Sequence, residues 1–270
     1  MRRCEFCDSP VPADATVCPV CKEEIAEETL ERILPLLRRP DSPDVREMGI
    51  FERLWGVLRR PAAAYRDISR RPDAAGPLLI ILANALVLAG FFIAISSKFT
   101  MTVTVNQTSG QTAELSILSG PYGTNVILTA FATILPSMML GMIYLVIGGA
   151  FAHLAFKITG GTGGKRKSVA IVGYSVLPVV LVRLVAIAVI LVTFPTYDVN
   201  LASQFSAVIA QVYDPSNWMV IDYLTMGAFF WTGFLLIFGI REAHDTSTLW
   251  AALVSLACMI VLVWTFWQVH

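Results

Sequence analysis

Four cysteines near the start of the chain have the spacing of a metal site. Cys4 and Cys7 form one Cys-x2-Cys pair, and Cys18 and Cys21 form a second pair after ten intervening residues. This spacing lets both sulfurs of a pair reach one ion at about 2.3 Å, and two pairs complete a tetrahedron. Because four thiolates leave no open position for a reacting water, the pattern predicts structural zinc rather than catalytic zinc. The same ligands also accept iron.

Residues 1–25 are expected to form a small zinc-ribbon head around these cysteines. Phe6, Val17 and Val20 are expected to supply its apolar core, with metal binding providing most of the folding energy. The head carries three basic residues (Arg2, Arg3 and Lys22) and five acidic ones (Glu5, Asp8, Asp14, Glu23 and Glu24). Its net negative charge repels phosphate, so we expect no binding to nucleic acid.

The rest of the chain has the composition of a membrane protein. Of its 270 residues, 56% are hydrophobic and only 15% are charged, whereas soluble domains have about 45–50% apolar and about 25% charged residues. Residues 1–77 hold 13 of the 20 Lys and Arg and 14 of the 20 Asp and Glu. A polar N-terminal part therefore precedes an apolar body, which we expect at 78–270.

Five apolar segments in that body are each long enough to cross a bilayer, which takes about 20 residues. They are residues 78–97, 126–158, 169–194, 219–240 and 249–269. Backbone groups must pair within a segment in lipid, so the segments are expected to be helices. The fold class predicted is all-α, a polytopic membrane helix bundle of about five spans. The two longest segments contain Pro136 and Pro178, where we expect the helices to bend or break.

The basic residues indicate the orientation of the spans. With five spans, 18 Lys and Arg fall on one side of the membrane and only Lys98 on the other, while Arg183 lies within the third span. The positive-inside rule then places the N-terminus in the cytoplasm and His270 outside. A reducing cytoplasm would also keep the four cysteines available for metal.

The external loop after the first span alternates in the manner of strands. Thr102–Val105 and Glu114–Leu118 flank a polar turn, which predicts an external β-hairpin. Asn106 begins an Asn-x-Thr sequon on this side, which makes it a possible glycosylation site.

Between the head and the first span, residues 26–77 are expected to form charged and amphipathic helices. One helix face is apolar, with Phe51, Leu54, Trp55 and Leu58. Basic residues follow at Arg59, Arg60, Arg66, Arg70 and Arg71. A basic amphipathic helix with Trp suits the surface of an anionic bilayer, so these residues are interpreted as a membrane-surface site. The arginines also enforce topology, and the two roles are compatible.

Arg183 lies near the middle of the third span, where a charge normally faces protein or water. Asp222, near the outer end of the fourth span, is the carboxylate expected to reach that depth. We expect an intramembrane ion pair between them that locks two helices together. A role in transport or proton relay is the alternative.

Two stretches of the chain resemble the Yip1 family of multi-span membrane proteins. The first contains Arg60-Pro61, Tyr65-Arg66-Asp67-Ile68 and Pro72, and the second runs from Gly163-Gly164-Lys165 through Gly173-Tyr174 to Leu177-Pro178. The resemblance covers roughly residues 47–268. It implies a non-enzymatic membrane protein with no catalytic residues. Eukaryotic members are associated with vesicle traffic and small GTPases, and prokaryotic members often carry an N-terminal zinc ribbon.

The sequence contains neither an HExxH nor a GxSxG motif, and no catalytic pairing is visible. The hypothesis that fits best is a membrane scaffold or adaptor in the plasma membrane of a prokaryote. Its partners are then the lipid bilayer and a protein at the cytoplasmic face, recruited through the zinc ribbon. The alternative is a transporter of small solutes or ions that uses the kinked spans and Arg183.

Overall fold

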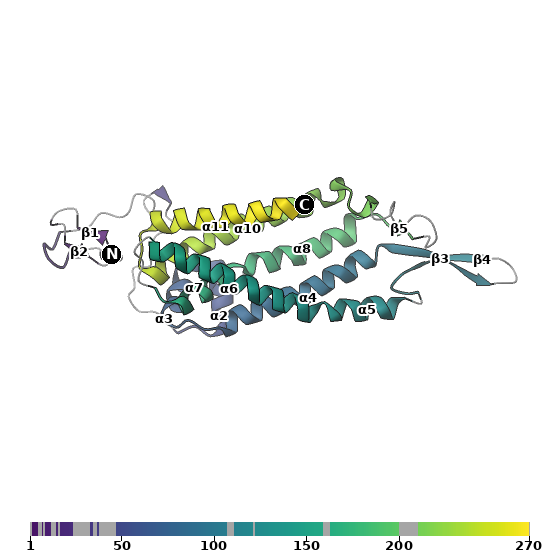
Figure 1. The fold of residues 1–270 in the computed structure, drawn as a ribbon, viewed down its shortest axis with the longest axis horizontal. Coiled ribbons are helices and arrows are strands. Elements are labelled where there is room, and N and C mark those ends of the chain that lie inside the picture. The colour runs from purple at the N-terminus through teal and green to yellow at the C-terminus, as the bar shows by residue number, and fades with distance from the viewer. Residues whose placement is uncertain are drawn as a thin grey trace. The chain divides into compact units, whose positions relative to one another are not determined.

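The computed structural model describes residues 2–4, 7, 9–11, 15, 17–23, 33–34, 37, 47–106, 111–120, 122–158, 163–199 and 210–269. Figure 1 shows the helices and strands along the chain. In order they are β1 (Arg2–Arg3), β2 (Pro10–Val11), α2 (Ile50–Arg59), α3 (Pro61–Arg70), α4 (Ala75–Ser96), β3 (Phe99–Asn106), β4 (Gln111–Ser116), α5 (Gly123–Ala132), α6 (Ile134–Ile158), α7 (Lys165–Ser175), α8 (Leu177–Thr193), β5 (Tyr197–Asp198), α10 (Pro215–His244) and α11 (Thr248–Val269).

Four helical segments of the described chain are long and apolar enough to cross a membrane. They are Ala75–Ser96, Gly123–Ala155, Lys165–Thr193 and Pro215–His244. A shorter apolar helix, Thr248–Trp264, lies within α11. The prediction of an all-α polytopic bundle is therefore confirmed. Crossing by the fifth helix and the domain borders at residues 25 and 77 stay predictions.

The two long spans are interrupted close to their prolines. The helix breaks at Thr133, three residues before Pro136, and at Val176, two residues before Pro178. Proline has no N–H to donate and its ring disturbs the preceding turn, so each proline sits in the first turn of a new helix. At the first break the Thr133 hydroxyl donates to the carbonyl of Ala130 at 2.6 Å. The bends expected from the sequence are thus present, slightly upstream of each proline.

Contacts divide the chain into two compact units. Unit 1 comprises Met1–Ile80, Met142–Pro178 and Phe229–His270, and unit 2 comprises Ile81–Gly141 and Val179–Ala228. The expected amphipathic linker helices are α2 and α3, which belong to unit 1. Much of the linker before Glu47 lies outside the described residues.

Unit 2 contains the predicted β-hairpin. β3 and β4 pair antiparallel, with Thr100 opposite Ser116 and Thr102 opposite Glu114. The sequon residue Asn106 ends β3 opposite Gln111, and the turn between them lies outside the described residues. A third strand, β5, pairs parallel with β3 and was not anticipated, because a two-residue strand has no periodicity to detect.

The helices of unit 2 pack around a small apolar core. Its buried residues come from α4, α8 and α10 and from the residue after α8: Ala94, Ala186, Ile190, Phe194 and Ile221. Trp218 extends this core, with its ring edge-on to Phe194 at 5.3 Å between centroids. Its indole N–H donates to the carbonyl of Val212 at 2.6 Å, which satisfies the polar end of the ring.

In unit 1 the linker helices pack on α7 and α10. α2 and α3 contact each other, and both contact α7. On α10, Gly239 lies against Ile171 of α7 and Tyr65 of α3, so closely that a Cβ atom would overlap the Ile171 side chain. The absence of a side chain at this position is therefore what allows the three helices to approach.

Gly239→Ala is expected to destabilise the protein by about 1–3 kcal/mol, because the added methyl group overpacks this junction. Gly227→Ala is the matched control on the same helix, since nothing lies within 4 Å of a Cβ there. That change is expected to be neutral or to stabilise by about 0.5–1 kcal/mol. Thermal unfolding of both variants in detergent measures the difference. Equal midpoints for the two variants would contradict the close packing.

Candidate metal centre and buried charge network

The four N-terminal cysteines converge as the sequence predicts. The sulfurs of Cys4, Cys7, Cys18 and Cys21 all lie within 4.8 Å of one another. Cys4 Sγ is 3.5 Å from Cys21 Sγ, and Cys7 Sγ is 3.6 Å from Cys18 Sγ. A tetrahedron with metal–sulfur bonds of about 2.3 Å has edges of about 3.8 Å. The cluster can therefore hold a metal ion with little movement of the sulfurs.

The backbone around the second cysteine pair forms a tight turn. The N–H of Lys22 donates to the carbonyl of Cys18 at 2.9 Å, and Lys22 has a φ of 61°. This is the left-handed region, which glycine adopts without strain. Lys22 therefore adopts the left-handed turn although it is not glycine.

The apolar core of the head differs from the expected one. Val11 of β2 is fully buried with Cys4 and Cys18. Val17 and Val20 are exposed, so the prediction that they form the core is wrong, and Phe6 lies outside the described residues. The pairing of β1 with β2 places Val11 beneath the cysteines, which no local sequence pattern reveals.

Hydrogen bonds in the head favour the metal-binding form of one cysteine. The side chain and backbone of Ser9 hydrogen-bond Cys7 and lower the pKa of its thiol to about 6. A thiolate is the form that ligates a metal ion, and only part of the cluster is shifted toward it, because burial and hydrogen bonds with the other thiols raise the pKa of Cys21 to about 12.

Purified protein is expected to contain one metal ion per chain, and Cys18→Ser is expected to lose it. Elemental analysis measures the stoichiometry and separates zinc from iron. Cys258→Ser makes the same change on α11, outside the cluster, and is expected to keep the full metal content. Metal retained in Cys18→Ser, or lost equally from both variants, would contradict the assignment.

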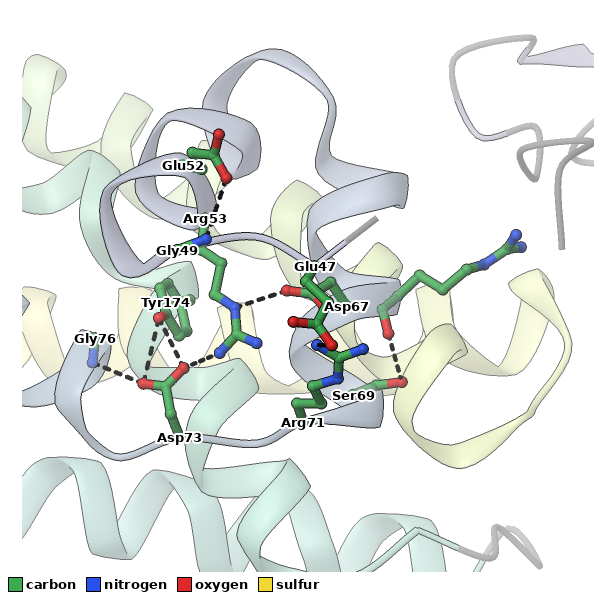
Figure 2. A network of polar contacts seen from close by, with 11 residues as sticks. Glu47, Gly49, Glu52, Arg53, Asp67, Ser69, Arg71, Asp73, Gly76 and Tyr174 are labelled. Carbon is green, nitrogen blue, oxygen red and sulfur yellow. Dashed lines mark hydrogen bonds and ion pairs between the residues drawn. The ribbon is translucent and has the colours of Figure 1, made fainter. Parts of the chain in front are cut away.

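A second group of polar residues lies buried in unit 1, where α2, α3 and the start of α4 meet α7. Figure 2 shows Arg53 of α2 between the carboxylates of Asp67 and Asp73. Arg53 Nε donates to Asp67 Oδ2 at 2.7 Å, and Arg53 Nη1 donates to Asp73 Oδ2. Arg53 is 6% exposed and Asp67 is fully buried.

Asp73 is also the acceptor for two further groups in Figure 2. The hydroxyl of Tyr174, on α7, donates to Asp73 Oδ2 at 3.1 Å, and the N–H of Gly76 donates to Asp73 Oδ1 at 2.8 Å. Asp73 therefore caps the start of α4 while it ties that helix to α2 and α7. We name Arg53, Asp67, Asp73 and Tyr174 the buried charge network.

The network balances the charge of Arg53 in a buried position. Burial by itself lowers the pKa of Arg53, but the hydrogen bond and charge of Asp67, together with the charge of Asp73, outweigh it and raise the pKa. One arginine faces two carboxylates, and the Tyr174 hydroxyl donates to the second of them. Removing Arg53 would therefore leave the buried carboxylate of Asp67 without its counter-charge.

A neighbouring hydrogen bond joins α3 to α7. The Ser175 hydroxyl donates to the carbonyl of Ile171 at 2.8 Å, so the Tyr65 hydroxyl can donate to Ser175 Oγ at 2.6 Å. Tyr65 is fully buried, and burial raises the pKa of its hydroxyl well above the ordinary value. The two stretches that carry the resemblance to the Yip1 family thus meet here, through Tyr65 with Ser175 and Asp73 with Tyr174.

The comparison with protein families agrees with that resemblance. The Yip1 domain matches residues 55–268, which is most of the chain. The chain belongs to the Yip1 family. No curated protein and no solved structure matches it. It is therefore an integral membrane protein of the Yip1 type, and the family is not a known enzyme family.

In this Yip1 domain the structure corrects part of the predicted membrane-surface site. Arg66 is not at the surface: it is buried, and its Nε donates to Glu242 Oε2 at 3.1 Å. Arg241 Nη2 contacts the other oxygen of Glu242 at 3.2 Å, and Arg241 Nη1 lies 3.3 Å from Thr248 Oγ1. Glu242 is 176 residues from Arg66 in the sequence, so no local pattern indicates that the two side chains pair.

The rest of the predicted surface site is divided between exposed and half-buried positions. Phe51 and Trp55 are 78% and 59% exposed. Leu54 and Leu58 are half-buried, and Arg59, Arg60, Arg70 and Arg71 are exposed. Arg71 pairs with Glu47. Helix α2, within which the matched region begins, therefore buries a charge, Arg53, and exposes aromatic side chains, which is the reverse of a helix in a soluble domain.

The predicted intramembrane ion pair stays a prediction. Within unit 2 of the Yip1 domain, Arg183 Nη1 of α8 donates to Asn84 Oδ1 of α4. Asn84 was not anticipated, because one amide in an apolar span has no distinctive spacing. This hydrogen bond links two spans and satisfies part of the guanidinium, as a structural role for Arg183 requires.

Replacing Arg53 with Met is expected to destabilise the Yip1 domain by about 3–5 kcal/mol, because two carboxylates lose their buried counter-charge. The exposed Arg59→Met, on the same helix, is expected to change stability by less than about 0.5 kcal/mol. Thermal unfolding in detergent compares them. Adding Asp67→Asn and Asp73→Asn to Arg53→Met is expected to restore part of the loss. Equal stability of the two single variants would contradict the network.

Proposed function

We propose that this Yip1 protein is a non-enzymatic membrane scaffold or adaptor, with the metal-binding head as its recruiting element. The observation that carries the proposal is the orientation of α2. Arg53 attaches one face to the bundle, and Phe51 and Trp55 project from the other. Aromatic side chains beside arginines suit the boundary between lipid headgroups and acyl chains.

The contacts of Trp55 support an interfacial position for α2. The guanidinium of Arg59 lies over the Trp55 ring, 4.9 Å from its centroid. This cation–π contact keeps the charge at the edge of the aromatic face. In a bilayer, Phe51 and Trp55 enter the interface while Arg59 and Arg60 face the phosphates.

The distribution of charge supports the orientation that we propose. The protein lies in the plasma membrane of a prokaryote. Its head and linker are on the cytoplasmic side, and the β3–β4 hairpin is outside. The Asp67 and Glu242 carboxylates balance buried arginines of unit 1, while exposed Arg59, Arg60 and Arg70 remain at the surface. Zinc is the metal proposed for the four cysteines, since four thiolates in a tetrahedron are typical of structural zinc.

Co-purification of bound proteins from native membranes tests the adaptor role. The variant is Cys4→Ser/Cys7→Ser, which removes half of the metal ligands, and the control is Cys258→Ser. Quantitative mass spectrometry is expected to show proteins whose recovery falls about tenfold or more in the first variant, which corresponds to a loss of about 1.4 kcal/mol of binding free energy. The recovery of the same proteins is expected to stay unchanged in the control. An identical set of proteins with all three chains would contradict recruitment by the head.

A further inference from the structure

An open groove of about 400 Å³ lies in unit 1 between the α2–α3 turn and the second half of α10. Its lining combines two arginines, Arg59 and Arg60, with three aromatic residues, Trp231, Phe234 and Phe238. Neither the buried charge network nor the metal centre contributes to it. The groove therefore needs an explanation of its own.

The floor of the groove is a cluster of aromatic rings on a membrane span. The rings of Phe234 and Phe238 pack edge to face, with centroids 5.2 Å apart. Phe238 is buried, which fixes the cluster, while Trp231 and Phe234 are more than one-third exposed. Exposed aromatic area of this kind is stabilised by contact with hydrocarbon.

The rim of the groove is positively charged. Arg59 and Arg60 are exposed at the end of α2, and α3 begins directly after them at Pro61. The first-turn N–H groups of Ala62 and Ala63 have no acceptor within their helix, and they add to the positive potential. Among the residues that the structure describes, no Asp or Glu lines the groove. An anion is the complementary ligand for this rim.

We propose that the groove binds one anionic glycerophospholipid, with its phosphate between Arg59 and Arg60 and an acyl chain along Trp231 and Phe234. A soluble phosphate satisfies the rim but leaves the aromatic floor uncovered, whereas a phospholipid covers both. The inference deepens the proposed function and rests on the interfacial position of α2. A lipid held here links the linker helices to α10 through a ligand as well as through the ion pair of Arg66 with Glu242.

Native mass spectrometry of the full chain in detergent tests the site, with phosphatidylglycerol and phosphatidylcholine of the same acyl chains as probes. Phosphatidylglycerol is expected to bind at one molecule per chain, more tightly than phosphatidylcholine. Arg59→Gln/Arg60→Gln is expected to weaken its binding about 10- to 30-fold, from about 1 kcal/mol for each arginine. The control Lys165→Gln/Arg166→Gln removes two exposed charges elsewhere in unit 1 and is expected to leave binding unchanged.

Three further measurements separate the alternatives. Trp231→Ala is expected to weaken both lipids, because it removes part of the floor. The proposal would be overturned by any of three results: equal loss of lipid in the two double variants, equal binding of the two lipids, or displacement of phosphatidylglycerol by excess inorganic phosphate.

Phe51→Ser separates the lipid site from the adaptor role. It disturbs the interfacial face of α2 without touching the groove, so it is expected to retain the lipid in detergent even if the adaptor role fails. Loss of the lipid in Phe51→Ser would also overturn the proposal.

Discussion

The charge of Arg53 can be buried because Asp67 and Asp73 balance it, and that requirement fixes how α2 and α3 fold. Asp67 lies on α3 and Asp73 lies just before α4, so satisfying one guanidinium determines where three successive helices meet (Figure 2). Tyr174 completes the coordination of Asp73 from α7. Helices α2 and α3 are therefore held as part of the helical unit that they precede.

That attachment explains the unusual surface of α2. With Arg53 and Val57 buried against the unit, Phe51 and Trp55 necessarily face outward. In water this surface would be unfavourable, but at a bilayer interface it contributes hydrophobic and aromatic contacts. Arg59 and Arg60, at the end of the same helix, then line the groove where we place a phospholipid. The charge that is buried thus determines which side chains are available to the membrane.

The sequence predicts some of these features well and others not at all. Cysteine spacing identifies the metal ligands, because the chemistry of the site is local to two short turns. Apolar segment length identifies four spans, and alternation identifies the β-hairpin. In contrast, Arg53, Arg59 and Arg66 are all arginines of two short amphipathic helices, although Arg53 and Arg66 are buried and Arg59 is exposed. The carboxylates that pair with the two buried arginines lie from 14 to 176 residues away in the sequence, and no periodicity connects residues at such separations.

Hydrogen exchange of the full chain in lipid nanodiscs tests most directly whether the buried charge network holds the linker on the bundle. Amides of α2 and α3 are expected to exchange as slowly as those of α7, and Arg53→Met is expected to accelerate exchange in α2 and α3 much more than in α8. Rapid exchange of α2 and α3 in the unaltered chain, or the same slow exchange in Arg53→Met, would contradict the account.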